Sequence, residues 1–126
     1  MKKILLVDDD YAMFKDVVNM NLEDMPEENG SDFALIETGP VRIAAEALQM
    51  IRNHPEADII LLDRMFGWKE DCGGVLPHLT REEIGKIICF SGSPHEWKGF
   101  LKEYGVRHFG GKRGYARCLS EKCNCD

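Results

Sequence analysis

Two short apolar runs in this chain end directly at carboxylates. The run ILLV at 4–7 is followed by three aspartates at 8–10, and the run IILL at 59–62 is followed by Asp63. Four consecutive Ile, Leu or Val residues are typical of a parallel strand that is buried on both faces. Because the carboxyl ends of parallel strands form the ligand-binding edge of open α/β sheets, we expect these carboxylates to meet there. They repel one another unless a proton or cation intervenes, which favours a divalent metal with oxygen ligands.

Length and composition indicate one domain. The 126 residues, 44% hydrophobic and 30% charged, are enough for one core, so we expect a single domain over 1–126 with a loosely held tail from about residue 120. A net charge of −6 argues against direct contact with nucleic acid. No apolar run approaches the roughly 18 residues of a membrane span, and the first residues lead into a strand and not into a signal peptide. We therefore expect a cytoplasmic protein that contacts no membrane.

Strand and helix patterns alternate along the rest of the chain. Further apolar runs at 33–36, 87–90 and 106–110 predict strands, and apolar residues at helical spacing predict helices near 11–23, 41–51, 75–83 and 97–104, with a short last helix from Tyr115. We expect Asp10 to cap the first helix and Gly105 to end the fourth. The pattern is (βα)5, an α/β architecture with a doubly wound parallel five-stranded sheet and helices on both faces. The stretch after Asp63 is the least regular.

The cysteines do not form the pattern of a disulfide framework. Their number, five, is odd, and Cys72 and Cys89 fall in or beside predicted regular elements. Cys118, Cys123 and Cys125 crowd the tail as C-x4-C-x-C, which lacks the paired C-x2-C spacing of common structural zinc sites. We expect reduced thiols, and zinc held together with a histidine from elsewhere in the chain is the alternative.

The predicted carboxyl edge of the sheet also carries a hydroxyl, from Ser91, and an ammonium group, from Lys112. Together with the carboxylates they suffice for phosphoryl transfer, whose loose transition state needs positioning and charge neutralisation more than it needs a base. Asp63 can accept a phosphoryl group as an acyl phosphate. Asp8 and Asp9 would hold Mg²⁺, while Lys112 and Ser91 would contact phosphoryl oxygens.

Four short motifs, in this order and at these separations, resemble those of the receiver domain of two-component response regulators. They are LVDD at 6–9, LLD at 61–63, FSG at 90–92 and Lys112, so the resemblance covers essentially the whole chain. It implies a flavodoxin-like receiver fold with strand order 2-1-3-4-5, similar to the single-domain chemotaxis regulators. It also implies a phospho-accepting signalling domain and not an enzyme in the usual sense, apart from self-catalysed phosphorylation and dephosphorylation.

The resemblance implies the partners as well. The phosphoryl group would come from a sensor histidine kinase or a histidine phosphotransfer protein, and a downstream protein target would bind the switched surface. The last predicted helix is short, which favours a monomer or a weak homodimer.

Position by position, the resemblance implies an acceptor and a metal site. Asp63 matches the aspartate that becomes 4-aspartylphosphate. Asp8 and Asp9 match the acidic pair that binds Mg²⁺ beside Asp63. The backbone carbonyl of Met65 matches the third protein ligand of the metal.

Three further residues match the phosphoryl contacts and the switch of the family. Lys112 matches the family's lysine, Ser91 the hydroxyl that moves toward the phosphoryl group, and Phe109 the aromatic residue whose inward or outward rotamer reports activation. Family members usually have a proline after the lysine, joined by a cis peptide bond, whereas Arg113 follows here. A cis bond before a non-proline residue costs roughly 2.5–4 kcal/mol, which favours a trans loop and a different direction for Lys112.

Two alternatives stay open. The first is a receiver-like interaction module without phosphoryl turnover, motivated by the missing proline after Lys112 and by Gly67, which stands where the family has a proline after the acceptor. The second is a small phosphatase of the haloacid dehalogenase type, because Asp8-x-Asp10 after a first strand is similar to its nucleophile motif. That reading makes Asp8 the nucleophile and leaves Asp63 without a role.

Overall fold

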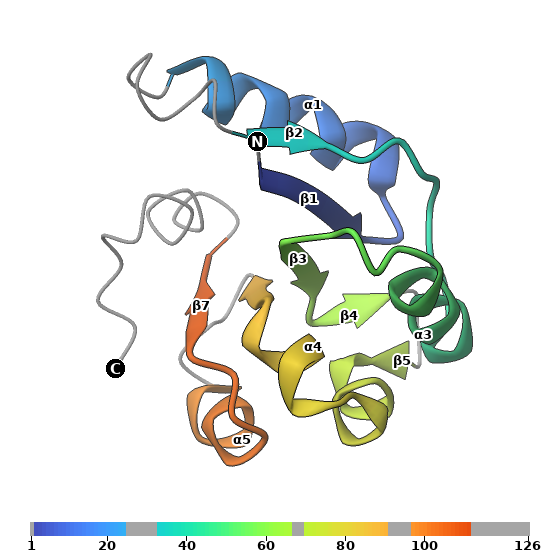
Figure 1. Ribbon diagram of the computed structural model, residues 1–126, viewed down its shortest axis with the longest axis vertical. Helices are drawn as coiled ribbons and strands as arrows, with labels where there is room; N and C mark the ends of the chain where they lie inside the picture. Colours follow the sequence, from blue (N-terminus) through green and yellow to red (C-terminus); the bar gives the residue numbers. More distant parts are fainter. Residues whose placement is uncertain (1, 25–32, 67–69, 91–96, 112–126) are drawn as a thin grey trace.

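A parallel sheet of five strands forms the centre of the protein (Figure 1). The computed structural model describes residues 2–24, 33–66, 70–90 and 97–111. The strands of the sheet are β1 (Lys2–Val7), β2 (Phe33–Leu35), β3 (Ile59–Asp63), β6 (Ile87–Phe90) and β7 (His108–Gly110). Their spatial order is β2-β1-β3-β6-β7, and every neighbouring pair is parallel. This order confirms the predicted α/β fold class and the predicted strand order 2-1-3-4-5.

Helices cover both faces of the sheet (Figure 1). α1 (Tyr11–Asp24) lies on one face, and α3 (Ala44–Asn53), α4 (Arg81–Gly85) and α5 (Lys98–Glu103) lie on the other. The helices predicted near 11–23 and 97–104 correspond to α1 and α5, whereas α3 begins later than the pattern from 41 indicated. Within the described ranges, no helix is long and apolar enough to cross a membrane. The helix predicted from Tyr115 lies outside the described residues.

Side chains of the central strands alternate between two cores, one on each face. In β1, Leu5 and Val7 join the core beneath α3 and α5, whereas Ile4 and Leu6 join the core beneath α1. All four side chains are completely buried. An uninterrupted apolar run is therefore needed here because neither face of the strand reaches water.

The prediction of a helix over 75–83 was wrong about the residue at which the helix begins. The chain forms 3-10 turns at Cys72–Gly74 and Leu76–His78, and α4 begins only after Thr80. The Thr80 hydroxyl accepts the Glu83 N–H at 3.2 Å, and the Glu83 carboxylate accepts the Thr80 N–H at 2.8 Å. This capping box satisfies backbone donors at the helix start. Its T-x-x-E pattern was visible in the sequence and was the signal that the prediction missed.

α5 ends in a Schellman motif at Gly105. Gly105 has a φ of 87°, a left-handed conformation that favours glycine. Its N–H donates to the Lys102 carbonyl at 3.0 Å, and the Val106 N–H donates to the Leu101 carbonyl at 2.9 Å. These bonds satisfy two of the last carbonyls of the helix and confirm the predicted stop at Gly105.

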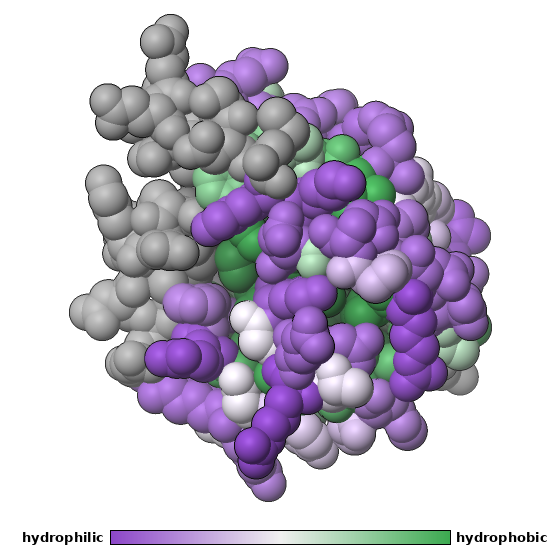
Figure 2. Space-filling view, viewed as in Figure 1, coloured by the Kyte–Doolittle hydropathy of each residue, from purple (hydrophilic) through white to green (hydrophobic). Residues whose placement is uncertain are grey.

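The face of the molecule shown in Figure 2 is mainly hydrophilic, with small apolar areas between polar residues. Among the described residues, the large apolar side chains that are exposed are Met13, Met20 and Ile43. Met13 and Met20 lie on α1, where their side chains contribute little to the core. They provide controls for substitutions on the buried face of the same helix.

We predict that Phe14→Ala lowers the free energy of unfolding by about 3–5 kcal/mol, because a buried ring is lost and a cavity opens. Phe14 of α1 stacks on Phe90 of β6, with 4.6 Å between the ring centroids and 6° between the ring planes. Urea unfolding measures the change. Met20→Ala, at a side chain that is 61% exposed, is expected to change the same quantity by less than about 0.5 kcal/mol. Equal losses in both variants would contradict the packing of α1 on the sheet.

Candidate functional site

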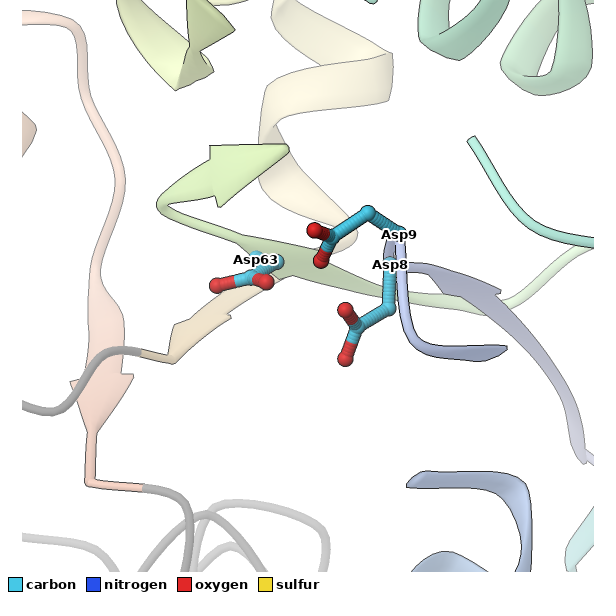
Figure 3. Close-up of side chains that lie close together, drawn as sticks. All are labelled: Asp8, Asp9 and Asp63. Atoms are coloured by element: carbon cyan, nitrogen blue, oxygen red, sulfur yellow. The ribbon is translucent and has the colours of Figure 1, made fainter. Parts of the chain in front are cut away.

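Three carboxylates converge at the carboxyl edge of the sheet (Figure 3). Asp8 and Asp9 follow β1, and Asp63 is the last residue of β3. The two strands are neighbours, and Val7 pairs with Leu62. The next residues along these strands, Asp8 and Asp63, therefore lie side by side. One oxygen of each of the three carboxylates lies within 4.8 Å of the others.

The cluster is largely shielded from water. Asp8 is 0% exposed and Asp63 is 5% exposed, while Asp9 is half-buried. One oxygen of Asp8, Oδ1, accepts the backbone N–H of Asp10 at 3.0 Å. The other oxygen, Oδ2, is buried and has no hydrogen-bond partner within the described part of the chain. A buried carboxylate oxygen without a donor is costly unless a proton or a cation compensates it.

Electrostatics at Asp8 favour its protonated form when no cation is bound. Burial raises the pKa of the Asp8 carboxyl from 3.8 to about 8, and the Asp10 N–H opposes this rise. The charge of Asp63 and the closeness of the Asp9 and Asp63 carboxylates raise the pKa further. Without a cation, the Asp8 carboxyl is therefore mostly neutral at neutral pH, which reduces its repulsion with Asp9 and Asp63.

The donor set fits a hard divalent cation. Mg²⁺ takes oxygen ligands and is commonly held by one or two carboxylates together with water. Asp8, Asp9 and Asp63 supply three carboxylates from two adjacent strand ends. The unpartnered Oδ2 of Asp8 is the atom that most needs a positive charge.

The remaining predicted site residues are distributed differently. Met65 is the first residue of strand β4, close after Asp63 in the chain. Phe109 lies in β7 opposite Cys89 and is 9% exposed, so its side chain is part of the core beneath α3 and α5. The following lie outside the described residues: Gly67, Ser91, Lys112, Arg113, Cys118, Cys123 and Cys125.

The irregular segment after Asp63 forms a small antiparallel hairpin. Strand β4 (Met65–Phe66) pairs with β5 (Glu70–Asp71). At the base of the hairpin, the backbone N–H of Cys72 donates to the Arg64 carbonyl at 2.7 Å. The chain therefore leaves the candidate acceptor along a fixed backbone path.

The turn that follows the hairpin leaves little room for a side chain at Gly73. The Asp71 carboxylate accepts the Gly73 N–H at 2.8 Å and so caps the 3-10 turn. A Cβ atom at position 73 would lie 2.7 Å from the same carboxylate oxygen. Any larger residue would therefore displace the cap.

Sequence reasoning missed Arg64 as a part of the site's surroundings. Its guanidinium carbon lies 4.6 Å from the centroid of the Trp97 ring, just before α5. The available signal was a basic residue directly after an acid-terminated buried strand. Its aromatic partner is distant in sequence and was not visible in the pattern.

Cys72 and Cys89 are buried free thiols. A hydrogen bond with Cys72 and burial raise the pKa of the Cys89 thiol well above 9.0. The charge of Asp63 raises this pKa too, whereas the charge of Arg64 lowers it. Cys89 therefore stays protonated, and its sulfur lies within electrostatic range of both charges.

No family model matches the chain, and no curated protein matches it in sequence. Solved structures of receiver domains, by contrast, match almost its whole length. The receiver domain of a Francisella response regulator is 19% identical, with 97% of this chain and 93% of that chain covered and a TM-score of 0.66. The BeF3-activated N-terminal receiver domain of Klebsiella pneumoniae RstA is 18% identical, with coverages of 95% and 94% and a TM-score of 0.65.

A sensor protein from Polaromonas is similarly close, at 17% identity, coverages of 96% and 94% and a TM-score of 0.68. At these identities the likeness is one of fold. The chain has the fold of response regulator receiver domains, which confirms the predicted fold resemblance.

We predict that the metal-free protein loses stability as the pH rises between about 4 and 8. Over this range the folded chain holds a proton on Asp8, whose pKa is raised from 3.8 to about 8, while the unfolded chain has lost it. The free energy of unfolding therefore falls with increasing pH. Asp8→Asn is expected to remove this slope and to raise the Tm near pH 8 by about 5 °C. Thermal unfolding in the presence of EDTA measures both effects.

The matched control is Asp16→Asn, at an exposed carboxylate of α1. This variant is expected to keep the pH slope of the unmodified protein. If Asp8→Asn keeps it as well, Asp8 is not the buried proton-holding group.

Proposed function

We propose that the chain is a receiver domain of a two-component system and accepts a phosphoryl group on Asp63. The observation that carries this proposal is the convergence of Asp8, Asp9 and Asp63 within 4.8 Å at the carboxyl edge of a receiver-type sheet, with Asp8 completely buried. Packing alone gives no reason for three acids at this place, because gathering buried like charges is costly. A cation and a transferred phosphoryl group give such a reason.

The reaction at Asp63 is a phosphoryl transfer. A carboxylate oxygen of Asp63 forms a bond to phosphorus while the N–P bond of a donor phosphohistidine breaks, and the electron pair stays on the departing imidazole nitrogen. The product is an acyl phosphate on Asp63. Attack of water on phosphorus later breaks the bond to Asp63 and returns the free carboxylate and inorganic phosphate.

The acidic cluster would hold Mg²⁺ through Asp8, Asp9 and Asp63, with the backbone carbonyl of Met65 as a further ligand. When bound, the metal neutralises charge on the acids and on the phosphoryl oxygens. The buried, unpartnered Oδ2 of Asp8 supports this assignment. Asp8 and Asp9 orient the cluster, and Asp63 carries the covalent chemistry.

Three more residues complete the proposed switch. The Lys112 ammonium group and the Ser91 hydroxyl bind phosphoryl oxygens, and Phe109 changes rotamer when Ser91 moves. In this structure the Phe109 side chain is already buried against the core, in β7.

The proposed setting is a cytoplasmic signalling pathway. A sensor histidine kinase or a histidine phosphotransfer protein donates the phosphoryl group, and a downstream protein binds the phosphorylated form. The whole chain acts as one receiver domain, as a monomer or a weak homodimer.

We predict that incubation with acetyl phosphate and Mg²⁺ adds the mass of one phosphoryl group to the protein. Asp63→Asn is expected to abolish the addition, because the amide cannot form an acyl phosphate. Intact-protein mass spectrometry measures the label. Asp16→Asn, which removes an exposed carboxylate of α1, serves as the control and is expected to retain it.

The alternatives give different outcomes in the same assay. An interaction module without phosphoryl turnover stays unlabelled under conditions that label a known receiver domain, and this result would overturn the proposal. A haloacid dehalogenase-type phosphatase releases phosphate in a reaction that Asp8→Asn abolishes and Asp63→Asn leaves unchanged.

We predict that the affinity for Mg²⁺ increases with pH up to about 8. Metal binding must displace the proton of Asp8, whose pKa is raised to about 8, so the affinity should rise about five- to tenfold per pH unit below that value. Titration calorimetry in two buffers of different protonation enthalpy measures both the affinity and the released proton. Asp8→Asn is expected to weaken binding at every pH and to remove the dependence. Pronounced pH dependence in that variant would contradict the role of Asp8.

A further inference from the structure

The backbone of Arg64 is held from two sides. Its N–H donates to the carbonyl of Phe90 at the end of β6 at 3.0 Å, and its carbonyl accepts the Cys72 N–H at the base of the hairpin at 2.7 Å. Moving this backbone would break either the sheet edge or the hairpin. A change at position 64 is therefore confined to the side chain.

The Arg64 side chain extends to an aromatic group in front of α5. Its guanidinium carbon lies 4.6 Å from the centroid of the Trp97 ring. Trp97 meets Phe100 edge to face at 5.1 Å and 84°, and Phe100 meets Tyr104 at 5.0 Å and 57°. These three rings pack against the same core as Cys89. Arg64 therefore connects the acceptor strand with the buried side of α5.

Arg64 also directly follows the candidate acceptor in the chain. Asp63 and Arg64 are consecutive residues, so their Cα atoms are about 3.8 Å apart. The Cys89 thiol senses both charges, since Asp63 raises its pKa and Arg64 lowers it. The guanidinium is thus a cation that acts on the same buried thiol as the Asp63 carboxylate.

Arginine suits two competing partners at this position. Its planar guanidinium stacks on aromatic rings and also matches the oxygens of a phosphoryl group with paired hydrogen bonds. Hydrogen bonds between a guanidinium and a phosphoryl group are charge-assisted and stronger than a half-exposed stack on an indole. A phosphoryl group on Asp63 would place the stronger partner on the residue that directly precedes Arg64 in the chain.

We propose that Arg64 is a phosphoryl-binding residue whose guanidinium leaves the Trp97 ring and binds a phosphoryl oxygen when Asp63 is phosphorylated. The departure uncovers Trp97 in front of α5. This inference rests on the proposed function, because it requires phosphorylation of Asp63. It adds a cation to the phosphoryl-binding site. It also explains how phosphorylation of Asp63 would change the exposure of Trp97 in front of α5.

The test follows Trp97 fluorescence in the full chain. The chain has two tryptophans, so Trp68→Phe leaves Trp97 as the only indole. Beryllium fluoride with Mg²⁺ serves as the phosphoryl mimic, and acrylamide quenching reports the exposure of Trp97. We expect the mimic to increase quenching when Arg64 is present and to leave it unchanged in Arg64→Met, which keeps a long unbranched side chain without the charge.

Binding of the mimic supplies a second readout. Arg64→Met is expected to weaken binding of beryllium fluoride about tenfold, the loss typical of one charge-assisted hydrogen bond, and Arg64→Lys to restore part of it. Arg107→Met is the matched control. Arg107 is exposed and lies before the amino end of β7, whereas the acidic cluster lies at the carboxyl ends of the strands. It is expected to bind the mimic like the unmodified protein.

Trp97→Leu tests the same competition between Trp97 and the mimic for Arg64, and it should change the affinity for the mimic in the opposite direction. Removing the ring frees Arg64 from its stack, so the mimic should bind about two- to fivefold more tightly. A purely structural role of the Arg64–Trp97 contact predicts weaker binding in both variants. Calorimetric titration of the mimic separates the two results even if Arg64→Met lowers the Tm.

The remaining outcomes are decisive as well. If the mimic binds Arg64→Met as tightly as the unmodified protein, or binds without changing the quenching of Trp97, the role of Arg64 is wrong while the proposed function stands. If the unmodified protein gains no mass with acetyl phosphate, the proposed function is wrong, and the inference fails with it.

Discussion

The pairing of β1 with β3 is the interaction on which the rest of the structure depends. Both strands are buried on two faces, and the pairing of Val7 with Leu62 sets the register at their ends. The carboxylates of Asp8 and Asp63 follow immediately and are brought together although they repel each other. Apolar packing along the strands therefore supplies the force that assembles a charged site.

The hairpin after Asp63 gives the site a second fixed boundary. The backbone of Arg64 bonds to Phe90 on one side and to Cys72 on the other, so β3 leads into a junction that is hydrogen-bonded on both sides. Side chains at this junction have more freedom than the backbone. Differences between the states of the protein are therefore expected in side-chain contacts such as that of Arg64 with Trp97.

The sequence predicted most of the fold because its strongest signals are local. Four-residue apolar runs mark the central strands, and Gly105 marks the end of α5. The start of α4 was misplaced because the capping box at Thr80 was overlooked in favour of a weak apolar period. The hairpin had no periodic signal, since its strands are only two residues long. The acidic cluster followed from strand order, whereas the partner of Arg64 depends on tertiary packing that no local pattern encodes.

The burial of Asp8 has a consequence for the stability of the fold. An asparagine at this position has nearly the same shape and would relieve the cost of a buried acid in a single substitution. Stabilising substitutions of this kind are easily found in proteins, and they commonly cost function where a site needs the less stable residue. The acid at this position therefore makes the metal-free fold less stable than an asparagine would.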